Sequence, residues 1–150
     1  MNIITSEVEL RKVSEKVKLY EMKDLLKKMP SIAKFMNDNN GCGLTGIQIG
    51  INKTFFIASL KGRVKVFINP TILQYSEETT IEEEGCLSFP GISKYIERSK
   101  SIRMTFFDYG LKKMTTQTFS GRDARILQHE YDHTLGIICV LDKAIIPEVI

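Results

Sequence analysis

The sequence predicts an α+β fold with mostly antiparallel strands, and three observations indicate this class. Two β-rich runs, residues 55–59 and 64–68, are joined through a Lys-Gly pair that is typical of a hairpin. A second pair of runs, residues 101–108 and 112–119, meets at an Asp-Tyr-Gly turn. A helix is then expected to begin near Ser120, so the strands precede it instead of alternating with helices. That order favours α+β over a repeating βαβ array.

The length and composition fit a single domain over residues 1–150. A chain of 150 residues can bury a core without disulfides, and 43% hydrophobic with 26% charged residues is ordinary globular usage. Lysine and arginine number 21 against 18 aspartates and glutamates, and the charges are interleaved. This small excess argues against specific nucleic-acid binding.

The N-terminus and the cysteines indicate the cellular compartment of the protein. No basic segment is followed by an apolar one at the N-terminus, and no stretch approaches the length of a membrane span. Three cysteines without regular spacing do not form a disulfide framework. We therefore expect a soluble, unexported protein with no membrane partner and with reduced thiols that can bind a metal.

The N-terminal third is expected to be structural. Residues 1–20 show no sustained period and are predicted to form an arm or a short helical turn. From Met22 to Met36 apolar residues recur at helical spacing, which predicts a core-facing helix. Pro30 interrupts this run, so the helix should kink or restart there.

The remaining elements are predicted from their flanking signals. Asn69-Pro70 should end the second strand, with further extended stretches at 71–75 and 79–83. Ser120, with Asp123 three residues later, is interpreted as a capping box at the start of the last long helix. Residues 137–141 are expected to form a final strand or turn.

A glycine-rich loop, residues 41–48, precedes the strands. Its three glycines within six residues allow close backbone approach or positive φ, as a site loop requires, and a plain turn is the alternative. It lacks the Lys-Ser or Lys-Thr of a phosphate loop and the spacing of a dinucleotide fingerprint. Gln48 is the residue in it that can donate side-chain hydrogen bonds.

The strongest chemical signal is the HExxH pattern of His129, Glu130 and His133. Residues four apart project from one side of a helix, so two imidazoles can hold one metal ion, and the adjacent carboxylate can take a proton from water. A chance match on a surface helix is the alternative. The chain has two histidines in all, and both fall in this motif, which favours a metal site.

A hydrolytic metal centre usually has three protein ligands, and the third is open at this point. The candidates are Cys42, Cys86, Cys139 and several carboxylates. Cys139 stands where metzincin proteases carry a third histidine, but it lies in an apolar run and too few residues follow for a Met-turn. Cys86 follows a β-run that leads into glycine and proline turns, so it can be held at the edge of a site.

Three segments together resemble a known family. GCGLTGIQ at 41–48, EEGCLS at 83–88 and QHEYDH at 128–133 are similar to the three signature motifs of peptide deformylases, over about residues 10–136. The resemblance implies the deformylase α+β fold, with antiparallel sheets around the HExxH helix. It also implies a metal-dependent hydrolase that removes the formyl group from the N-terminal methionine of new polypeptides and releases formate.

The resemblance implies a role for each matching residue. Cys86, His129 and His133 would bind one divalent metal ion, natively Fe²⁺, with Zn²⁺, Ni²⁺ or Co²⁺ possible. Glu130 would be the general base and acid. The Gln48 side chain and the Leu87 backbone N–H would hold the developing oxyanion.

Further residues are candidates for binding substrate. The glycines of the first motif would let the substrate backbone lie beside Cys42 and Gly43 as an added strand. Ile126 shares a helix stripe with the two histidines, so Ile126, Leu87 and Arg125 are expected to border the methionine pocket. The alternative places Ile126 in the core.

The resemblance also assigns residues behind the ligands. Arg98 resembles the family arginine that ties down Glu84 and Asp132 and thereby orients the ligand loops. A surface position is the alternative for Arg98.

Two features depart from the family. Thr45-Gly46 replaces a pair of alanines, so we expect altered packing beside the metal with Gln48 still in place. The chain also stops at Ile150, before the C-terminal helix of many bacterial members, and so resembles shortened forms such as those encoded by bacteriophages. The expected partners are N-formyl-methionyl nascent chains in the cytoplasm of a bacterium or bacterial host, and the ribosome is a further candidate partner that would have to bind without such a helix.

Two other functions are compatible with the motif. A small HExxH peptidase would cleave ordinary amide bonds, but a downstream third ligand on another helix has no chain left to carry it. A non-catalytic domain with structural zinc would normally close the site with four protein ligands and leave Glu130 without a role.

Overall fold

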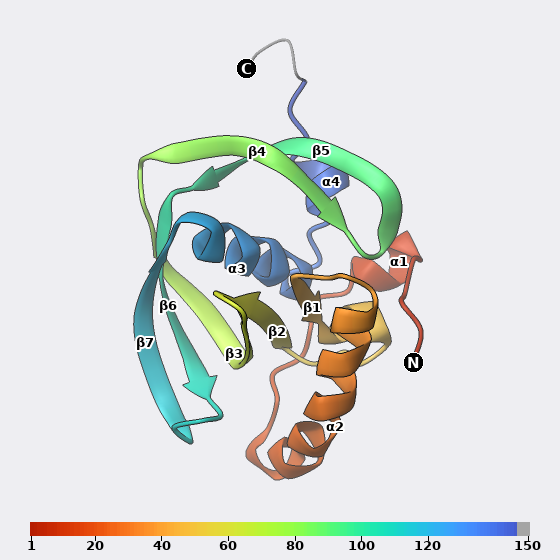
Figure 1. The fold of residues 1–150 in the computed structure, drawn as a ribbon. Helices are drawn as coiled ribbons and strands as arrows, with labels where there is room; N and C mark the ends of the chain where they lie inside the picture. The colour runs from red at the N-terminus through yellow and green to blue at the C-terminus, as the bar shows by residue number, and fades with distance from the viewer. Residues whose placement is uncertain (147–150) are drawn as a thin grey trace.

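The computed structural model describes residues 1–146, so the last four residues of the predicted 1–150 domain lie outside the described part. The chain begins with two helices, a short strand and a 3₁₀ turn, continues through six strands and ends with two helices (Figure 1). In order the elements are α1 (Glu7–Leu10), α2 (Leu19–Asp38), β1 (Gly43–Thr45), η1 (Gly46–Ile49), β2 (Phe55–Leu60), β3 (Arg63–Tyr75), β4 (Thr79–Cys86), β5 (Phe89–Ser99), β6 (Ser101–Asp108), β7 (Lys113–Ser120), α3 (Gly121–Thr134) and α4 (Cys139–Asp142).

The strands form two sheets in which every pairing is antiparallel. Five strands lie in the order β1-β2-β3-β6-β7, and β4 and β5 form a separate hairpin. Strands precede the long C-terminal helix, so the predicted α+β class is confirmed. Both predicted hairpins are present, as β2–β3 and β6–β7.

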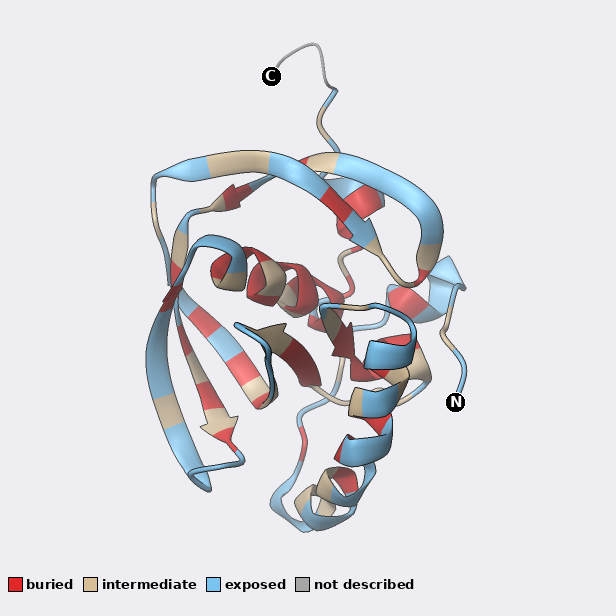
Figure 2. Cartoon of the chain, viewed as in Figure 1, coloured by how far each residue is buried: buried red, intermediate tan, exposed pale blue. Residues whose placement is uncertain are grey.

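Helix α3 lies at the centre of the molecule, with the β4–β5 hairpin arching over it and the five-stranded sheet on its other side (Figure 1). Nine of its fourteen residues are buried, and Figure 2 shows it largely enclosed. Because this helix carries the HExxH residues, the fold places them inside the protein.

The five-stranded sheet is apolar on both faces. Alternating residues point to opposite sides of a strand, and here Phe56 and Phe67 pack with Leu127 of α3 while Phe55 and Ile68 pack against α2. The helical stripe predicted between residues 22 and 36 is confirmed as core, with its buried members Leu25, Met29, Ile32 and Met36 facing the sheet.

Helix α2 continues through Pro30 without a restart. Pro30 is exposed, so the carbonyl that loses its helical hydrogen bond can be solvated. Burial of the apolar stripe on both sides of the proline then offsets the missing bond.

The prediction that Asn69-Pro70 ends a strand is wrong. Strand β3 passes through both residues, with a register shift against β6 between Ile68 and Thr71. Asn69 takes a positive φ of 49°, and its side chain hydrogen-bonds both the N–H and the carbonyl of Val17 at 2.9 Å. A bulge with this anchor absorbs the proline without ending the strand.

Other local predictions also need correction. Helix α3 does begin after Ser120, but the Ser120 side chain makes no capping hydrogen bond, so the capping box is wrong. Strand β5 was not expected, because most of its residues are exposed and it lacks an alternating apolar pattern. Of the two forms predicted for residues 137–141, strand or turn, the structure has a turn, the single helical turn α4 at Cys139–Asp142. No helix within residues 1–146 is long and apolar enough to cross a membrane.

Candidate metal centre and active site

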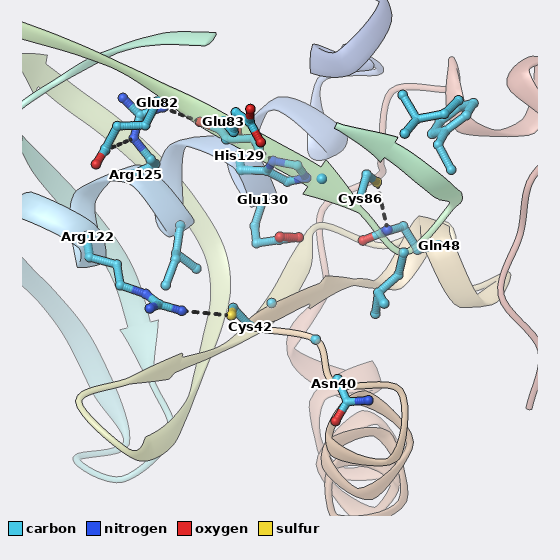
Figure 3. A pocket seen from close by; sticks show the side chains of 18 of the residues that line it. Asn40, Cys42, Gln48, Glu82, Glu83, Cys86, Arg122, Arg125, His129 and Glu130 are labelled. Atoms are coloured by element: carbon cyan, nitrogen blue, oxygen red, sulfur yellow. Dashed lines mark hydrogen bonds and ion pairs between the residues drawn. The ribbon is translucent and has the colours of Figure 1, made fainter. Parts of the chain in front are cut away.

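The two histidines of α3 face the same buried corner. Their ring centroids lie 5.3 Å apart, and His129 is 8% and His133 1% exposed. Cys86 at the end of β4 reaches this corner, with its Sγ 3.3 Å from His133 Nε2. One ligand atom from each of the three residues lies within 4.8 Å of the others. The fold therefore brings a thiol from mid-sequence to both imidazoles, and Figure 3 shows Cys86 beside His129.

The end of the β4–β5 hairpin places Cys86. The strand register shifts between Gly85 and Cys86, and Cys86 pairs with Phe89 across the tight connection through Leu87 and Ser88. This irregularity lets the last residue of β4 leave the regular pleat and approach α3.

The donor set fits one divalent cation. A thiolate and an imidazole that bind the same tetrahedral Zn²⁺ lie about 3.5 Å apart, close to the separation of Cys86 and His133. His129 Nδ1 lies 2.8 Å from Glu84 Oε1 and can donate to it, which leaves Nε2 free to coordinate a metal ion. Burial and the nearby charges of His129 and Arg98 lower the pKa of His133 to about 3, so its imidazole is neutral.

Cys139 forms a second possible group with Glu84 and His129. Its Sγ lies 3.3 Å from His129 Nδ1, on the ring nitrogen that also contacts Glu84. Burial lowers the pKa of His129, but hydrogen bonds with Cys139 and Cys86 outweigh it and raise that pKa well above the usual value. Both Glu84 oxygens already accept from the guanidiniums of Arg98 and Arg125, so a cation there would face two positive charges. The group with Cys86 is the better metal site.

Buried ion pairs join the hairpin to α3. Arg98 of β5 donates to Glu84 of β4 at 2.9 Å through two nitrogens and to Asp132 of α3 at 2.6 Å. It is 3% exposed, which excludes the alternative surface position. Burial raises the pKa of Glu84, but its hydrogen bonds with His129 and Arg98 bring that pKa well below the usual range. The carboxylate is therefore ionised and fixes the His129 ring.

Glu130 packs directly against the glycine-rich loop. It is 3% exposed, and a Cβ added to Gly43 would lie 2.7 Å from its carboxylate. No side chain fits at this position, which explains one glycine of the loop. Burial raises the pKa of Glu130 to about 7. The carboxylate lines the same cavity as His129 and Cys86 (Figure 3).

Gln48 of η1 approaches the metal corner, which is the buried corner where Cys86, His129 and His133 converge. Its Nε2 lies 3.5 Å from Cys86 Sγ and 3.2 Å from the Ser88 hydroxyl, and its Oε1 accepts from Thr45. Figure 3 shows the amide beside Cys86. Leu87 follows Cys86 and also lines the cavity. Sequence analysis did not identify Thr45 or Ser88 as site residues; the position of Ser88 inside the second motif was the available signal.

The predicted substrate-binding residues line one cavity. Cys42, Gly43, Arg125 and Ile126 all border it. The Arg125 guanidinium is bound to Glu84 and to other groups of β4, Glu82 and Thr80.

Arg122 is a further residue of this cavity, and the sequence analysis did not predict that it borders the substrate. It directs an N–H to Cys42 Sγ at 3.0 Å across the cavity (Figure 3). Its place on the same helix stripe as Ile126 and the histidines was the available signal.

A thiol and two imidazoles whose ligand atoms converge within 4.8 Å of one another, with the buried carboxylate of Glu130 next to them, fit a metal-dependent hydrolase. Residues 2–145 match the family model described as polypeptide deformylase. A peptide deformylase from Thermotoga maritima is 35% identical over 131 residues, which are 87% of this chain and 79% of that relative.

Solved structures agree with this match. A crystal structure of peptide deformylase from Thermotoga maritima has a TM-score of 0.90 and 32% identity and covers 97% of each chain. A Met-Ala-Ser-bound class I type b peptide deformylase from Acinetobacter baumannii has a TM-score of 0.88 and 28% identity, over 94% of this chain and 96% of that one.

The chain belongs to the polypeptide deformylase family. The predicted fold class, enzyme class and activity, removal of the formyl group from the N-terminus of new polypeptides, are confirmed. Metal dependence is a property of this family, and the peptidase and structural-zinc alternatives are disfavoured.

Proposed function

We propose that Cys86, His129 and His133 bind one divalent cation, at which this chain hydrolyses the formyl group of N-formyl-methionyl peptides to formate and a free amine. The observation that carries the proposal is the 3.3 Å approach of Cys86 Sγ to His133 Nε2 in a buried corner beside Glu130. A bound cation would supply the positive charge that acidifies water and polarises the formyl carbonyl.

Fe²⁺ is the proposed native ion. One thiolate and two imidazoles also suit Zn²⁺, Ni²⁺ and Co²⁺, so metal analysis of protein purified without air distinguishes them. A thiolate ligand near a cavity is open to oxidation, which makes air exclusion part of that measurement.

Glu130 is the proposed proton carrier. Its carboxylate takes a proton from the attacking water and later gives it to the nitrogen of the leaving amine. Gly43 holds it in place, because the backbone there packs against the carboxylate where no side chain fits. The same residue can serve both steps because it borders the cavity at the metal corner.

The proposed oxyanion donors are the Gln48 side chain and the Leu87 backbone N–H. Gln48 Nε2 faces Cys86 at 3.5 Å, so its N–H points toward the metal corner. Leu87 is the next residue after the ligand cysteine, which brings its backbone to the same place. Loss of one such donor typically costs about a hundredfold or more in rate.

The peptide is proposed to bind as an added strand between β1 and β4. Both are edge strands among the described residues, and Gly43 and the 82–86 part of β4 border the cavity. Cys42 and Gly43 then lie beside the substrate backbone, while Ile126, Leu87 and Arg125 border the first side chain. The Met-Ala-Ser complex of the Acinetobacter baumannii enzyme supports a peptide with N-terminal methionine in this cavity.

The cytoplasm is the proposed location, because nascent formylated chains are made there. One catalytic domain over residues 1–150 is likewise proposed, and the central position of α3 between both sheets supports it.

The test is Glu130→Gln, with Glu97→Gln as the matched control on the exposed side of β5. Formate release from a formyl-Met peptide and bound metal are measured on the same samples, purified without air. We expect Glu130→Gln to keep the metal and lose at least about a hundredfold in turnover, as expected for loss of a general acid–base group. Unchanged turnover would refute the role of Glu130, and a Cys86→Ala protein that retains full metal would refute the ligand set.

A further inference from the structure

Thr45 makes two hydrogen bonds to the same oxygen of Gln48. The Thr45 backbone N–H and its hydroxyl lie 3.1 Å and 3.0 Å from Gln48 Oε1. Both residues are 1% exposed, so water does not compete for these groups. The contact is therefore a fixed part of the protein interior.

The donors and acceptors determine which way the Gln48 amide faces. The Thr45 backbone N–H can only donate, so the group facing it must be the carbonyl oxygen of Gln48. The Thr45 hydroxyl, 3.0 Å from the same oxygen, must then donate as well. This leaves the Gln48 NH₂ group facing Cys86 and Ser88.

The NH₂ group has one hydrogen for each neighbour. One is directed to the Ser88 hydroxyl at 3.2 Å, and the other to Cys86 Sγ at 3.5 Å. Neutral sulfur is a weak acceptor, and a thiolate bound to a metal has less charge to offer. The second N–H is thus the one that a substrate oxygen next to Cys86 can take over.

We propose that Thr45 is a positioning residue for the reaction. Its hydroxyl holds the Gln48 amide in the orientation that directs an amide N–H toward the reacting carbonyl. The inference rests on the proposed role of Gln48 as an oxyanion donor. It also assigns a function to the Thr45-Gly46 pair, by which this chain differs from the paired alanines of the first motif.

Gly46 completes the arrangement. A Cβ added to Gly46 would lie 2.5 Å from the Phe55 ring and 2.6 Å from the Ile51 carbonyl oxygen. Without a side chain at Gly46, the Phe55 ring and the Ile51 carbonyl pack directly against the start of η1, and the turn there brings Gln48 back to Thr45 three residues earlier. The glycine and the threonine therefore act together.

The experiment compares Thr45→Val, which replaces the hydroxyl with a methyl group of similar size, with Thr45→Ser, which keeps the hydroxyl. Gln48→Ala and the double variant Thr45→Val/Gln48→Ala complete a cycle. Thr54→Val is the control, because its hydroxyl also donates to backbone carbonyls but lies outside the site. Formate release from a formyl-Met peptide gives kcat and KM, with metal content and Tm measured on the same proteins.

We expect Thr45→Val to lower kcat about three- to tenfold, as for loss of one neutral hydrogen bond, with KM and metal content unchanged. Thr45→Ser should restore most of kcat, and Thr54→Val should keep it. In the Gln48→Ala background Thr45→Val should change kcat less than twofold, because the amide that it positions is gone. If the role of Thr45 were purely structural, Thr45→Val would lower Tm, and its effect on kcat would persist in the Gln48→Ala background.

The outcomes separate this inference from the proposed function. If Gln48→Ala lowers kcat while Thr45→Val leaves it unchanged, the positioning role is overturned and the oxyanion role stands. If Gln48→Ala itself keeps full kcat, the oxyanion role fails and the inference fails with it. Should Thr45→Val not fold, Thr45→Ser and Thr45→Ala give the same comparison: equal kcat in the two overturns the inference.

Discussion

The five-stranded sheet and the β4–β5 hairpin are held in place by different forces. The sheet surrounds a cluster of phenylalanines, in which Phe67 lies 4.7 Å from Phe106 and 5.2 Å from Phe56 between ring centroids. The hairpin has only three buried residues within its strands, Glu84, Ile96 and Arg98, and two of these are charged. Figure 2 shows the contrast between the buried strands β1 and β2 of the sheet and the largely exposed arch of β4 and β5.

The sheet therefore contributes mainly to the stability of the fold, whereas the hairpin contributes mainly to the placement of the site residues. Apolar burial is non-directional, so the sheet gains free energy without fixing any one side chain relative to the metal corner. The Arg98 guanidinium binds carboxylates of β4 and α3 with defined geometry, and so it fixes the hairpin that carries Cys86 against the helix that carries the histidines. The hairpin can therefore position the site residues while it contributes few side chains to the hydrophobic core.

The largest effect is expected from Arg98→Met. Removal of the guanidinium leaves Glu84 and Asp132 buried with fewer partners, which typically costs about 3–5 kcal/mol of unfolding free energy. Because Glu84 orients His129, metal affinity should also fall about ten- to hundredfold. Urea unfolding of the metal-free protein and metal competition with a chelator measure the two quantities.

Lys94→Met is the matched control, since Lys94 is an exposed cation on the same strand. It should leave both quantities within error. Wild-type metal affinity in folded Arg98→Met protein would show that the ion cluster does not place the ligands.

A substitution in the sheet that costs a comparable free energy of unfolding should leave metal affinity unchanged. Ile68→Ala removes a fully buried side chain from the α2 side of β3 and should cost about 2–4 kcal/mol of unfolding free energy. Metal affinity and kcat of the folded protein should stay within twofold of wild type, measured at a temperature below the unfolding transition. A loss of metal as large as in Arg98→Met would remove the distinction between the two regions.

The same contrast explains what could be predicted from the sequence. The β2–β3 and β6–β7 hairpins have apolar runs and turn residues, so local pattern was sufficient for them. Strand β5 lacks an alternating apolar pattern because most of its residues are exposed and one of its two buried side chains is Arg98, and no local pattern reports a partner such as Glu84. Asn69-Pro70 has a strong turn signal, yet the bond between Asn69 and Val17, 52 residues away, overrides it.

The candidate site shows the same limit. Spacing in the HExxH motif was sufficient to pair His129 with His133, because one helix turn relates them. The choice of Cys86 over Cys139 needed the family resemblance, since both thiols lie within reach of His129 and only three-dimensional contacts show that Glu84 is already saturated. The Thr45 contact to Gln48 is local in sequence and fits the Thr-x-x-Gln spacing of a capping box, so a sequence signal for it was present.

The smallest effect on the free energy of unfolding is expected from a charged side chain at the end of the sheet. Asp108, at the end of β6, accepts from the Leu111 N–H at 3.1 Å and lies 3.3 Å from the Lys65 ammonium. Burial raises the pKa of Asp108, but the Leu111 N–H and Lys65 outweigh it and lower that pKa below the usual value. A carboxylate with a lowered pKa in the folded state stabilises the protein above its unfolded pKa of about 3.9, and this contribution is lost as the pH falls through the folded pKa.

Asp108→Asn should therefore cost less than about 1 kcal/mol at pH 7, and the difference from wild type should shrink as the pH falls below about 4. Urea unfolding of the metal-free proteins at pH 7 and pH 3 measures it. A cost of several kcal/mol at pH 7, equal to that of Arg98→Met, would mean that charges hold the sheet as they hold the hairpin. A small cost that disappears in acid would show that a charge at the rim of an apolar sheet adds little, because the phenylalanine cluster already supplies most of the free energy.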